Sequence, residues 1–186
     1  MDFENCTEEV QQIIENTFDI VCRCKSRYIM PEDMLYAMTF NRNFIECFEK
    51  NGGSTDELRM ELMEFIRDNG ECAKTDDDIR VTEDFGEMFA RAEVETQIGG
   101  REKIDLAHIF SAMMSLEESH AVYFLLKQNV DLLEVMGELS RLSLAEERSV
   151  DGEEAEYEYS DEDGWYVPGE SSPKSDKWKQ YVECIS

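Results

Sequence analysis

Basic residues are scarce in this chain: 18 Lys and Arg stand against 44 Asp and Glu among 186 residues, a formal net charge of -26. The resulting field repels nucleic-acid phosphates and anionic membrane surfaces, so we exclude both as partners. No run of about 18 apolar residues is present to span a bilayer. The start, Met-Asp-Phe-Glu-Asn, lacks the basic and apolar regions of a signal peptide, which predicts a cytoplasmic protein.

Sequence motifs for catalysis are also missing. No G-x-x-x-x-G-K-[ST] loop is present to hold nucleotide phosphates, and neither G-x-S-x-G nor H-E-x-x-H occurs. With only His108 and His120 in the chain, no serine or cysteine has an obvious general base. We therefore expect this chain to be no enzyme and to need no cofactor of its own.

The six cysteines do not form a metal-binding or redox pattern. They stand at positions 6, 22, 24, 47, 72 and 184, and none begins a C-x-x-C pair. Cys22 and Cys24 are two residues apart in a helical stretch, so they point to different faces. In a reducing compartment we expect thiols rather than disulfides, and we predict no metal site.

An internal repeat decides the expected fold. Thr7-Glu8-Glu9-Val10 matches Thr82-Glu83-Asp84-Phe85, and Ile29 matches Ile104 at the same offset, 104 - 29 = 75. The two copies cover residues of about 5–69 and 80–144. A unit of about 65 residues has little core of its own, so we expect both copies to pack as one pseudo-twofold bundle.

Each copy is predicted to contain four helices, which makes the fold class all-α. The first helix begins after a capping threonine, Thr7 or Thr82, followed by acids that suit the positive end of the helix dipole. Pro31 occupies a first-turn position of the second helix, and Asp105 is its counterpart as a cap. The fourth helices are expected at about 55–68 and 131–142. Core candidates recur at helical spacing, among them Met34, Leu35, Met38, Ile109, Phe110 and Met113.

The composition changes from about residue 146. Residues 146–174 are rich in Glu, Asp and Ser and include Pro168 and Pro173, so they cannot bury enough apolar surface to offset the entropy of ordering. We predict a disordered, flexible acidic linker. A short partner-binding motif built on Tyr157, Tyr159, Trp165 and Tyr166 stays open as an alternative.

Both copies carry a helix with a shared pattern: Ile29-Met30-Pro31-Glu32-Asp33-Met34-Leu35 in the first, and Ile104-Asp105-Leu106-Ala107-His108-Ile109-Phe110 in the second. The duplicated pattern resembles the Clp N-terminal repeat domain, over about three quarters of the chain, and assigns residues 1–145 to that domain. The second copy looks more like the ClpA type than ClpB or ClpC, where a Glu usually stands at the position of Ala107. Residues 175–186 resemble the lead-in to a first ATPase module.

The resemblance implies a docking domain of a ClpA-like AAA+ unfoldase that works in regulated protein degradation. The implied partners are a ClpS-like adaptor and protein substrates, with the ClpP peptidase reached only through the parent unfoldase. ATP and Mg are expected only for the ATPase modules, which this chain does not contain. A freestanding scaffold or regulator that uses the Clp fold to bind adaptors is the alternative.

Four residues at the starts of the second helices are candidates for the partner-binding surface: Glu32, Asp33, Asp105 and His108. The three acids are also what any helix N-terminus favours, so a purely structural role stays open. In ClpC-like relatives a Glu in each repeat binds phosphoarginine. Glu32 matches the first such position, whereas Ala107 replaces the second. The prediction of phosphoarginine binding is therefore weakened but stays open.

Overall fold

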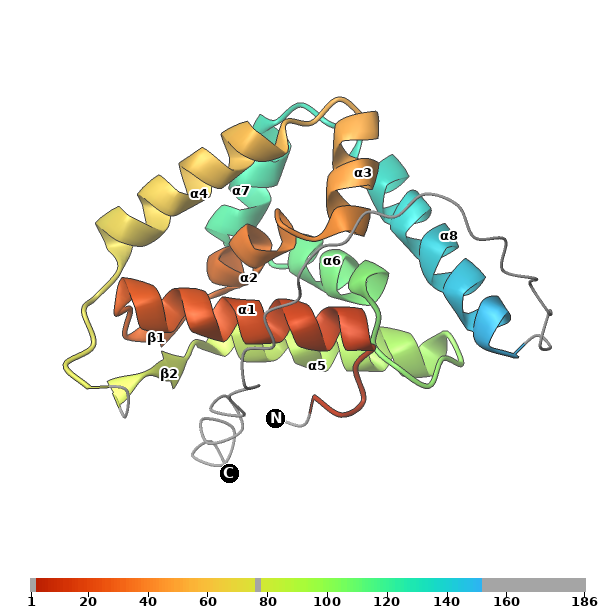
Figure 1. Cartoon of the computed structure of the whole chain (residues 1–186), viewed down its shortest axis with the longest axis horizontal. Coiled ribbons are helices and arrows are strands. Elements are labelled where there is room, and N and C mark those ends of the chain that lie inside the picture. Colours follow the sequence, from red (N-terminus) through yellow and green to blue (C-terminus); the bar gives the residue numbers. More distant parts are fainter. Residues whose placement is uncertain (1–2, 76–77, 152–186) are drawn as a thin grey trace, which may run out of the picture.

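The structure, a computed structural model, describes residues 3–75 and 78–151 (Figure 1). These residues form eight helices and two short strands. In chain order they are α1 (Glu8–Cys24), β1 (Tyr28–Ile29), α2 (Pro31–Met38), α3 (Arg42–Lys50), α4 (Thr55–Asn69), β2 (Arg80–Val81), α5 (Glu83–Ile98), α6 (Leu106–Met114), α7 (His120–Lys127) and α8 (Leu132–Asp151). The prediction of an all-α fold with four helices in each copy is confirmed.

The predicted caps lie at the helix starts. The Thr7 hydroxyl accepts a hydrogen bond from Val10 N, and the Thr82 hydroxyl accepts one from Phe85 N. Asp105 caps α6 by accepting from the N–H of His108 at 2.9 Å. These bonds satisfy backbone donors that have no partner within the helix, which explains why the chain turns helical at these residues.

The second helix of each copy lies at the centre of the bundle. α2 packs against α1 and α4, and α6 packs against α5 and α8. Other contacts cross between the copies; for example, α3 packs on α8, and α4 packs on α7. Figure 1 shows this arrangement, with α3 and α8 at one side of α2 and α6 and with α4 and α7 at the other. The copies therefore share a single core rather than forming two domains.

Backbone hydrogen bonds between the copies follow the same twofold relation. The N–H of Thr82 donates to Ile29 O at 3.1 Å, and the N–H of Thr7 donates to Ile104 O at 2.9 Å. Tyr28–Ile29 and Arg80–Val81 pair as the parallel strands β1 and β2. The sequence pattern did not predict these strands, because two residues are too few to show a strand periodicity.

The core consists of large side chains from both copies. Phe44, Phe48, Phe85 and Phe110 are fully buried, together with the predicted Met34, Leu35 and Met38 of α2. Phe44 of α3 lies 6.0 Å from Phe110 of α6 between ring centroids. Contacts of this kind join the two copies by apolar packing, which is the main source of stability in such a bundle.

The last helix is longer than the sequence suggested. α8 continues to Asp151, beyond the end of the second copy at 144 and into the first residues of the predicted linker. Leu144, Ala145, Glu146 and Arg148 are good helix formers, which favours this extension. The rest of the acidic segment and residues 175–186 lie outside the described residues. Within the described ranges, no helix is long and apolar enough to cross a membrane.

Candidate functional site

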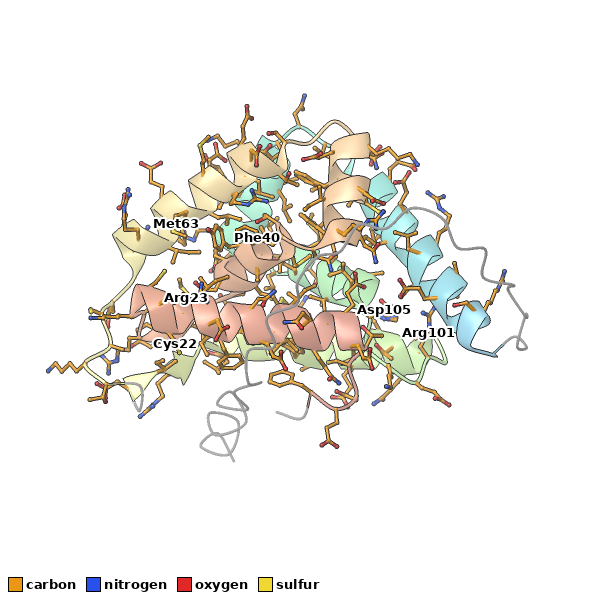
Figure 2. The ribbon with its side chains drawn as sticks, viewed as in Figure 1. Cys22, Arg23, Phe40, Met63, Arg101 and Asp105 are labelled. Carbon is orange, nitrogen blue, oxygen red and sulfur yellow. The ribbon has the colours of Figure 1, made fainter. Side chains whose placement is uncertain are left out.

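A groove opens on the first copy between α1, α2 and α4, with a volume of about 350 Å³. Figure 2 labels Arg23, Phe40 and Met63 in this half of the molecule. The lining of the groove is largely apolar and aromatic, with polar groups from α1. The residues are Asn16, Asp19, Ile20, Arg23, Cys24, Tyr36, Phe40 and Met63. Grooves with an apolar lining and a few polar groups are the usual form of a ligand site in proteins.

Phe40 is the most exposed aromatic residue of this groove, with 52% of its surface accessible. The Tyr36 ring meets it edge to face, with 5.3 Å between centroids. Phe40 also contacts Arg59, whose guanidinium carbon lies 4.2 Å from the Phe40 ring centroid. Arg59 in turn donates to Thr39 O at 2.6 Å, so α4 holds the turn that carries Phe40. The ring is therefore exposed and at the same time fixed in place.

Burial changes the acidity of two groove side chains. It raises the pKa of the Tyr36 hydroxyl and the pKa of the Cys24 thiol, and the nearby Asp33 carboxylate raises the latter further. A thiol with a raised pKa is protonated at neutral pH and is a poor nucleophile. Cys24 thus contributes a small apolar surface rather than reactivity. The structure has no disulfide among the cysteines of residues 3–75 and 78–151.

Glu32 lies inside the bundle and not on an open surface, with 5% of its area exposed. Its Oε1 accepts hydrogen bonds from the Ser119 hydroxyl and from Ala121 N, each at 3.0 Å. Ser119 and Ala121 stand at the start of α7, so this carboxylate caps a helix of the other copy. An anion at a helix N-terminus is stabilising because of the helix dipole and the unpaired N–H groups.

Asp33 is completely buried at the start of α2. Its Oδ2 accepts from Met30 N at 2.8 Å, whereas its Oδ1 has no hydrogen-bond partner among the described residues. Burial raises the pKa of Asp33 to about 7. The hydrogen bond from Met30 N opposes this rise in pKa, and the nearby Glu32 carboxylate adds to it. The carboxyl group is therefore partly protonated near neutral pH.

Asp105 and His108 lie together on the second copy, and Arg101 joins them (Figure 2 labels Arg101 and Asp105). Asp105 Oδ2 lies 2.9 Å from Arg101 Nη2, and Asp105 Oδ1 lies 2.9 Å from His108 Nδ1. Burial alone would raise the pKa of Asp105, but hydrogen bonds from His108, Ser143 and the backbone N–H of His108 hold it below its ordinary value. The carboxylate stays ionised and fixes both basic groups.

A second cavity of about 270 Å³ lies beside this cluster, between α5, α6 and α8. By the repeat offset of 75, it overlaps in part with the groove of the first copy, because Glu95 and Ser111 in its lining stand at the positions of Ile20 and Tyr36. Ser115, at the position of Phe40, does not line this cavity. The two copies have thus kept the same architecture and diverged in the side chains that face the ligand space.

The four predicted partner-binding residues lie at the starts of α2 and α6. Glu32 and Asp33 lie in the first copy and Asp105 and His108 in the second, and Glu32, Asp33 and Asp105 are all buried. Each of the three acids hydrogen-bonds backbone groups at a helix N-terminus, which is the structural role that stayed open for them. A contribution to partner binding stays a prediction for these residues.

The groove residues were missed by reasoning from the sequence alone. Phe40 stands just beyond α2, and Arg59 lies on α4, so neither belongs to the repeated motif. The one available signal was an aromatic residue directly before the Asn41 cap, outside the buried stripe of either neighbouring helix. In the described residues, no group of three or more His, Cys, Asp or Glu side chains is placed to hold a metal ion.

Comparisons with known proteins agree on the fold. The family model for the Clp repeat N-terminal domain matches residues 5–128. The N-terminal domain of Hsp104 from Candida albicans superposes with a TM-score of 0.66 at 14% identity, covering 75% of this chain and 92% of that one.

Two further solved structures resemble the chain. The N-terminal domain of the chaperone ClpD from Arabidopsis thaliana gives a TM-score of 0.62 at 15% identity and covers 77% of this chain and 97% of that one. The N-terminal domain of the E. coli ClpV1 ATPase gives 0.54 at 15% identity, with 77% and 86% covered. The family model spans most of both copies, and the chain belongs to the Clp repeat N-terminal domain family.

Proposed function

We propose that this chain is the adaptor- and substrate-docking domain of a ClpA-like, ATP-dependent unfoldase that acts with ClpP in the cytoplasm. Its family and its similarity to the N-terminal domains of Clp-type ATPases support a docking role in general. The ClpA-like identity, a ClpS-like adaptor and the link to ClpP are the finer parts of the proposal. They rest on the second copy, where Ala107 stands in place of an acid.

The groove between α1, α2 and α4 carries the proposal. It is apolar, about 350 Å³ in volume, and presents Phe40 to the solvent in a fixed orientation. Single exposed apolar residues are common on protein surfaces, but Phe40 also lines an apolar groove and is held by contacts with Tyr36 and Arg59. A groove of this size accepts one or two large apolar side chains of an adaptor or an unfolded segment, with Asn16, Asp19 and Arg23 available for polar contacts along its edge.

The chain itself takes no part in chemistry under this proposal. It needs no cofactor, because ATP and Mg would bind the ATPase modules that follow such a domain in the parent protein. The absence of a phosphate-binding loop from the sequence supports this division of labour. A freestanding scaffold would use the same groove and differs only in having no ATPase attached.

Phosphoarginine reading is the second alternative, and the contacts of Glu32 count against it. The Oε1 atom that a guanidinium would need already accepts from Ser119 and Ala121. A ligand would have to displace both bonds at the start of α7 and enter a site where 5% of Glu32 is exposed. The equivalent position in the second copy, Ala107, has no carboxylate.

Binding calorimetry with the full chain tests the docking proposal. The ligands are a ClpS-type adaptor, a permanently unfolded protein such as reduced and carbamidomethylated α-lactalbumin, and free phosphoarginine. We expect the adaptor or the unfolded protein to bind, and Phe40→Ser to weaken that binding about tenfold or more, because the variant removes an aromatic anchor. Phosphoarginine is expected not to bind.

Tyr123→Ser is the matched control, since Tyr123 is an aromatic residue of α7 that is 58% exposed and lies outside the groove. Both variants remove an exposed ring, so both should leave the thermal midpoint nearly unchanged. Equal loss of binding in the two variants would contradict a site at Phe40. Phosphoarginine binding that disappears in Glu32→Ala would favour the ClpC-like alternative, and silence with every ligand would refute the docking role.

A further inference from the structure

The cavity between α5, α6 and α8 continues into an exposed apolar surface. Leu133, Met136 and Gly137 share one face of α8 and line the cavity, and Leu133 is 75% exposed. On the α5 side, Glu95 lines the cavity, and Ile98, three residues later on the same face, is 83% exposed. α6 lies between these two helices (Figure 1). We call this surface the α5–α8 groove, and its residues are Val94, Glu95, Ile98, Leu133, Met136 and Gly137.

The charge of this groove favours a basic occupant. Arg101 and His108, the basic groups of the cavity lining, each bond the buried Asp105 at 2.9 Å, so their charge is already compensated. Within residues 3–75 and 78–151, neither Glu95 nor the exposed Glu134 of α8 has an ion pair. Residues 1–151 carry 15 Lys and Arg against 34 Asp and Glu, 15 - 34 = -19. The surrounding field therefore attracts cations to the groove.

One segment of this chain has the complementary composition. Residues 152–186 contain three lysines, all within residues 174–179, where Asp176 is the single acid, 3 - 1 = +2. Apolar residues follow at helical spacing, namely Trp178, Tyr181, Val182 and Ile185. In a helix, Lys177 and Lys179 would stand at the two edges of that apolar face. A helix of this kind matches an apolar groove with acidic edges.

We propose that residues 174–185 dock as an amphipathic helix in the α5–α8 groove of their own chain. Trp178 lies on Leu133 and Met136, and the lysines at the edges of the helix face the acids at the edges of the groove. Docking limits how far the domain moves from any module attached to this segment. The contact is independent of the Phe40 groove and of the ligand proposed for it.

The connecting chain is long enough for this contact. α8 ends at Asp151, 178 - 151 = 27 residues before Trp178. A flexible chain of that length has a root-mean-square span of about 30 Å, which is comparable to the size of the domain. Such a tether gives an effective concentration on the order of 1 mM. An affinity of only about 0.1 mM would therefore keep the groove occupied for about nine-tenths of the time.

Tryptophan fluorescence of the full chain tests the proposal. The chain has two tryptophans, Trp165 and Trp178, so the emission of Trp165→Phe comes from Trp178 alone. We expect this emission to be blue-shifted and protected from acrylamide, compared with the same variant unfolded in urea, because the docked indole is partly buried. Trp178→Phe is the matched control, in which the remaining Trp165 should be quenched as readily as in the unfolded chain.

Groove variants of Trp165→Phe connect the signal to the two walls. Leu133→Lys and Ile98→Lys each replace an exposed apolar side chain by a cation, and both should abolish the blue shift. Leu126→Lys is the control, because Leu126 is 62% exposed on α7 and the change of charge is the same. Glu95→Gln should weaken docking about two- to fivefold, as measured by acrylamide quenching, whereas Glu93→Gln, outside the cavity lining, should not.

Docking within one chain also predicts an emission that does not depend on protein concentration. The proposal is overturned if Trp178 is quenched as in the unfolded chain, if both tryptophans are protected equally, or if Leu126→Lys acts like Leu133→Lys. A blue shift that grows with protein concentration would place the segment in the groove of a second molecule and overturn it too. Phe40→Ser should leave the Trp178 emission unchanged, so that failure here is separate from failure of the docking groove.

Discussion

Removal of the Glu32 carboxylate should destabilise the bundle at the junction between its two copies. The carboxylate accepts two hydrogen bonds at 3.0 Å, from Ser119 and Ala121, inside the fold. Bonds to a charged acceptor contribute roughly 1.5–3 kcal/mol each. Ala121 N keeps a second acceptor, the Ser119 hydroxyl at 3.1 Å. We therefore expect Glu32→Ala to lower the free energy of unfolding by about 2–3 kcal/mol.

Glu32→Gln is the matched variant, because its amide oxygen can still accept both bonds but carries no charge. Its cost should stay near 1 kcal/mol, which reflects the weaker bonds and the lost helix-dipole interaction. Urea unfolding followed by circular dichroism measures both values, and it is preferable to fluorescence because Trp165 and Trp178 lie outside the described residues. A cost below about 0.5 kcal/mol for Glu32→Ala would refute the capping role.

Two further predictions concern stability. Asp33 has a folded-state pKa raised to about 7, so the stability it contributes is fully present below its ordinary pKa of 3.8 and is lost as the pH rises through 7. The free energy of unfolding of Asp33→Asn, relative to that of the wild type, should therefore increase by at most about 4 kcal/mol between pH 4 and pH 8, as measured by urea unfolding. A difference that is constant with pH would contradict the burial of an unpaired oxygen. Thr82→Ala should cost about 2 kcal/mol and Thr7→Ala about 1 kcal/mol, because the Thr82 hydroxyl caps α5 and also donates to Ile29 O at 3.0 Å, whereas Thr7 only caps α1. Equal costs for the two threonines would show that the bond to Ile29 adds nothing.

The fold could be predicted from the sequence because its signals are local and duplicated. Thr7 and Thr82 identify the starts of equivalent helices, and apolar residues at helical spacing identify the faces that meet in the core. The end of α8 was less predictable, since nothing in the composition near residue 145 stops a helix. The pairing of β1 and β2 depends on contacts between the copies, which no local pattern reports.

The candidate site was less accessible to the same reasoning. Glu32 reads as an ordinary acid in the first turn of α2, yet the start of α7 approaches it from the other copy and turns it into a buried acceptor. Phe40 lies in the turn after α2 and Arg59 lies on α4, so they form one feature only after the bundle folds. The divergence of Tyr36 and Ser111 was visible at the repeat offset, but its meaning depends on the cavities that these residues line.

Chemical-shift mapping of the ¹⁵N-labelled chain with an unfolded protein or a ClpS-type adaptor tests the central claim most directly. The account predicts that the largest shifts cluster on α1, α2 and α4 around Phe40, and that they vanish in Phe40→Ser but persist in Tyr123→Ser. Shifts that centre instead on α7, or that survive the loss of Phe40, would contradict docking in the apolar groove.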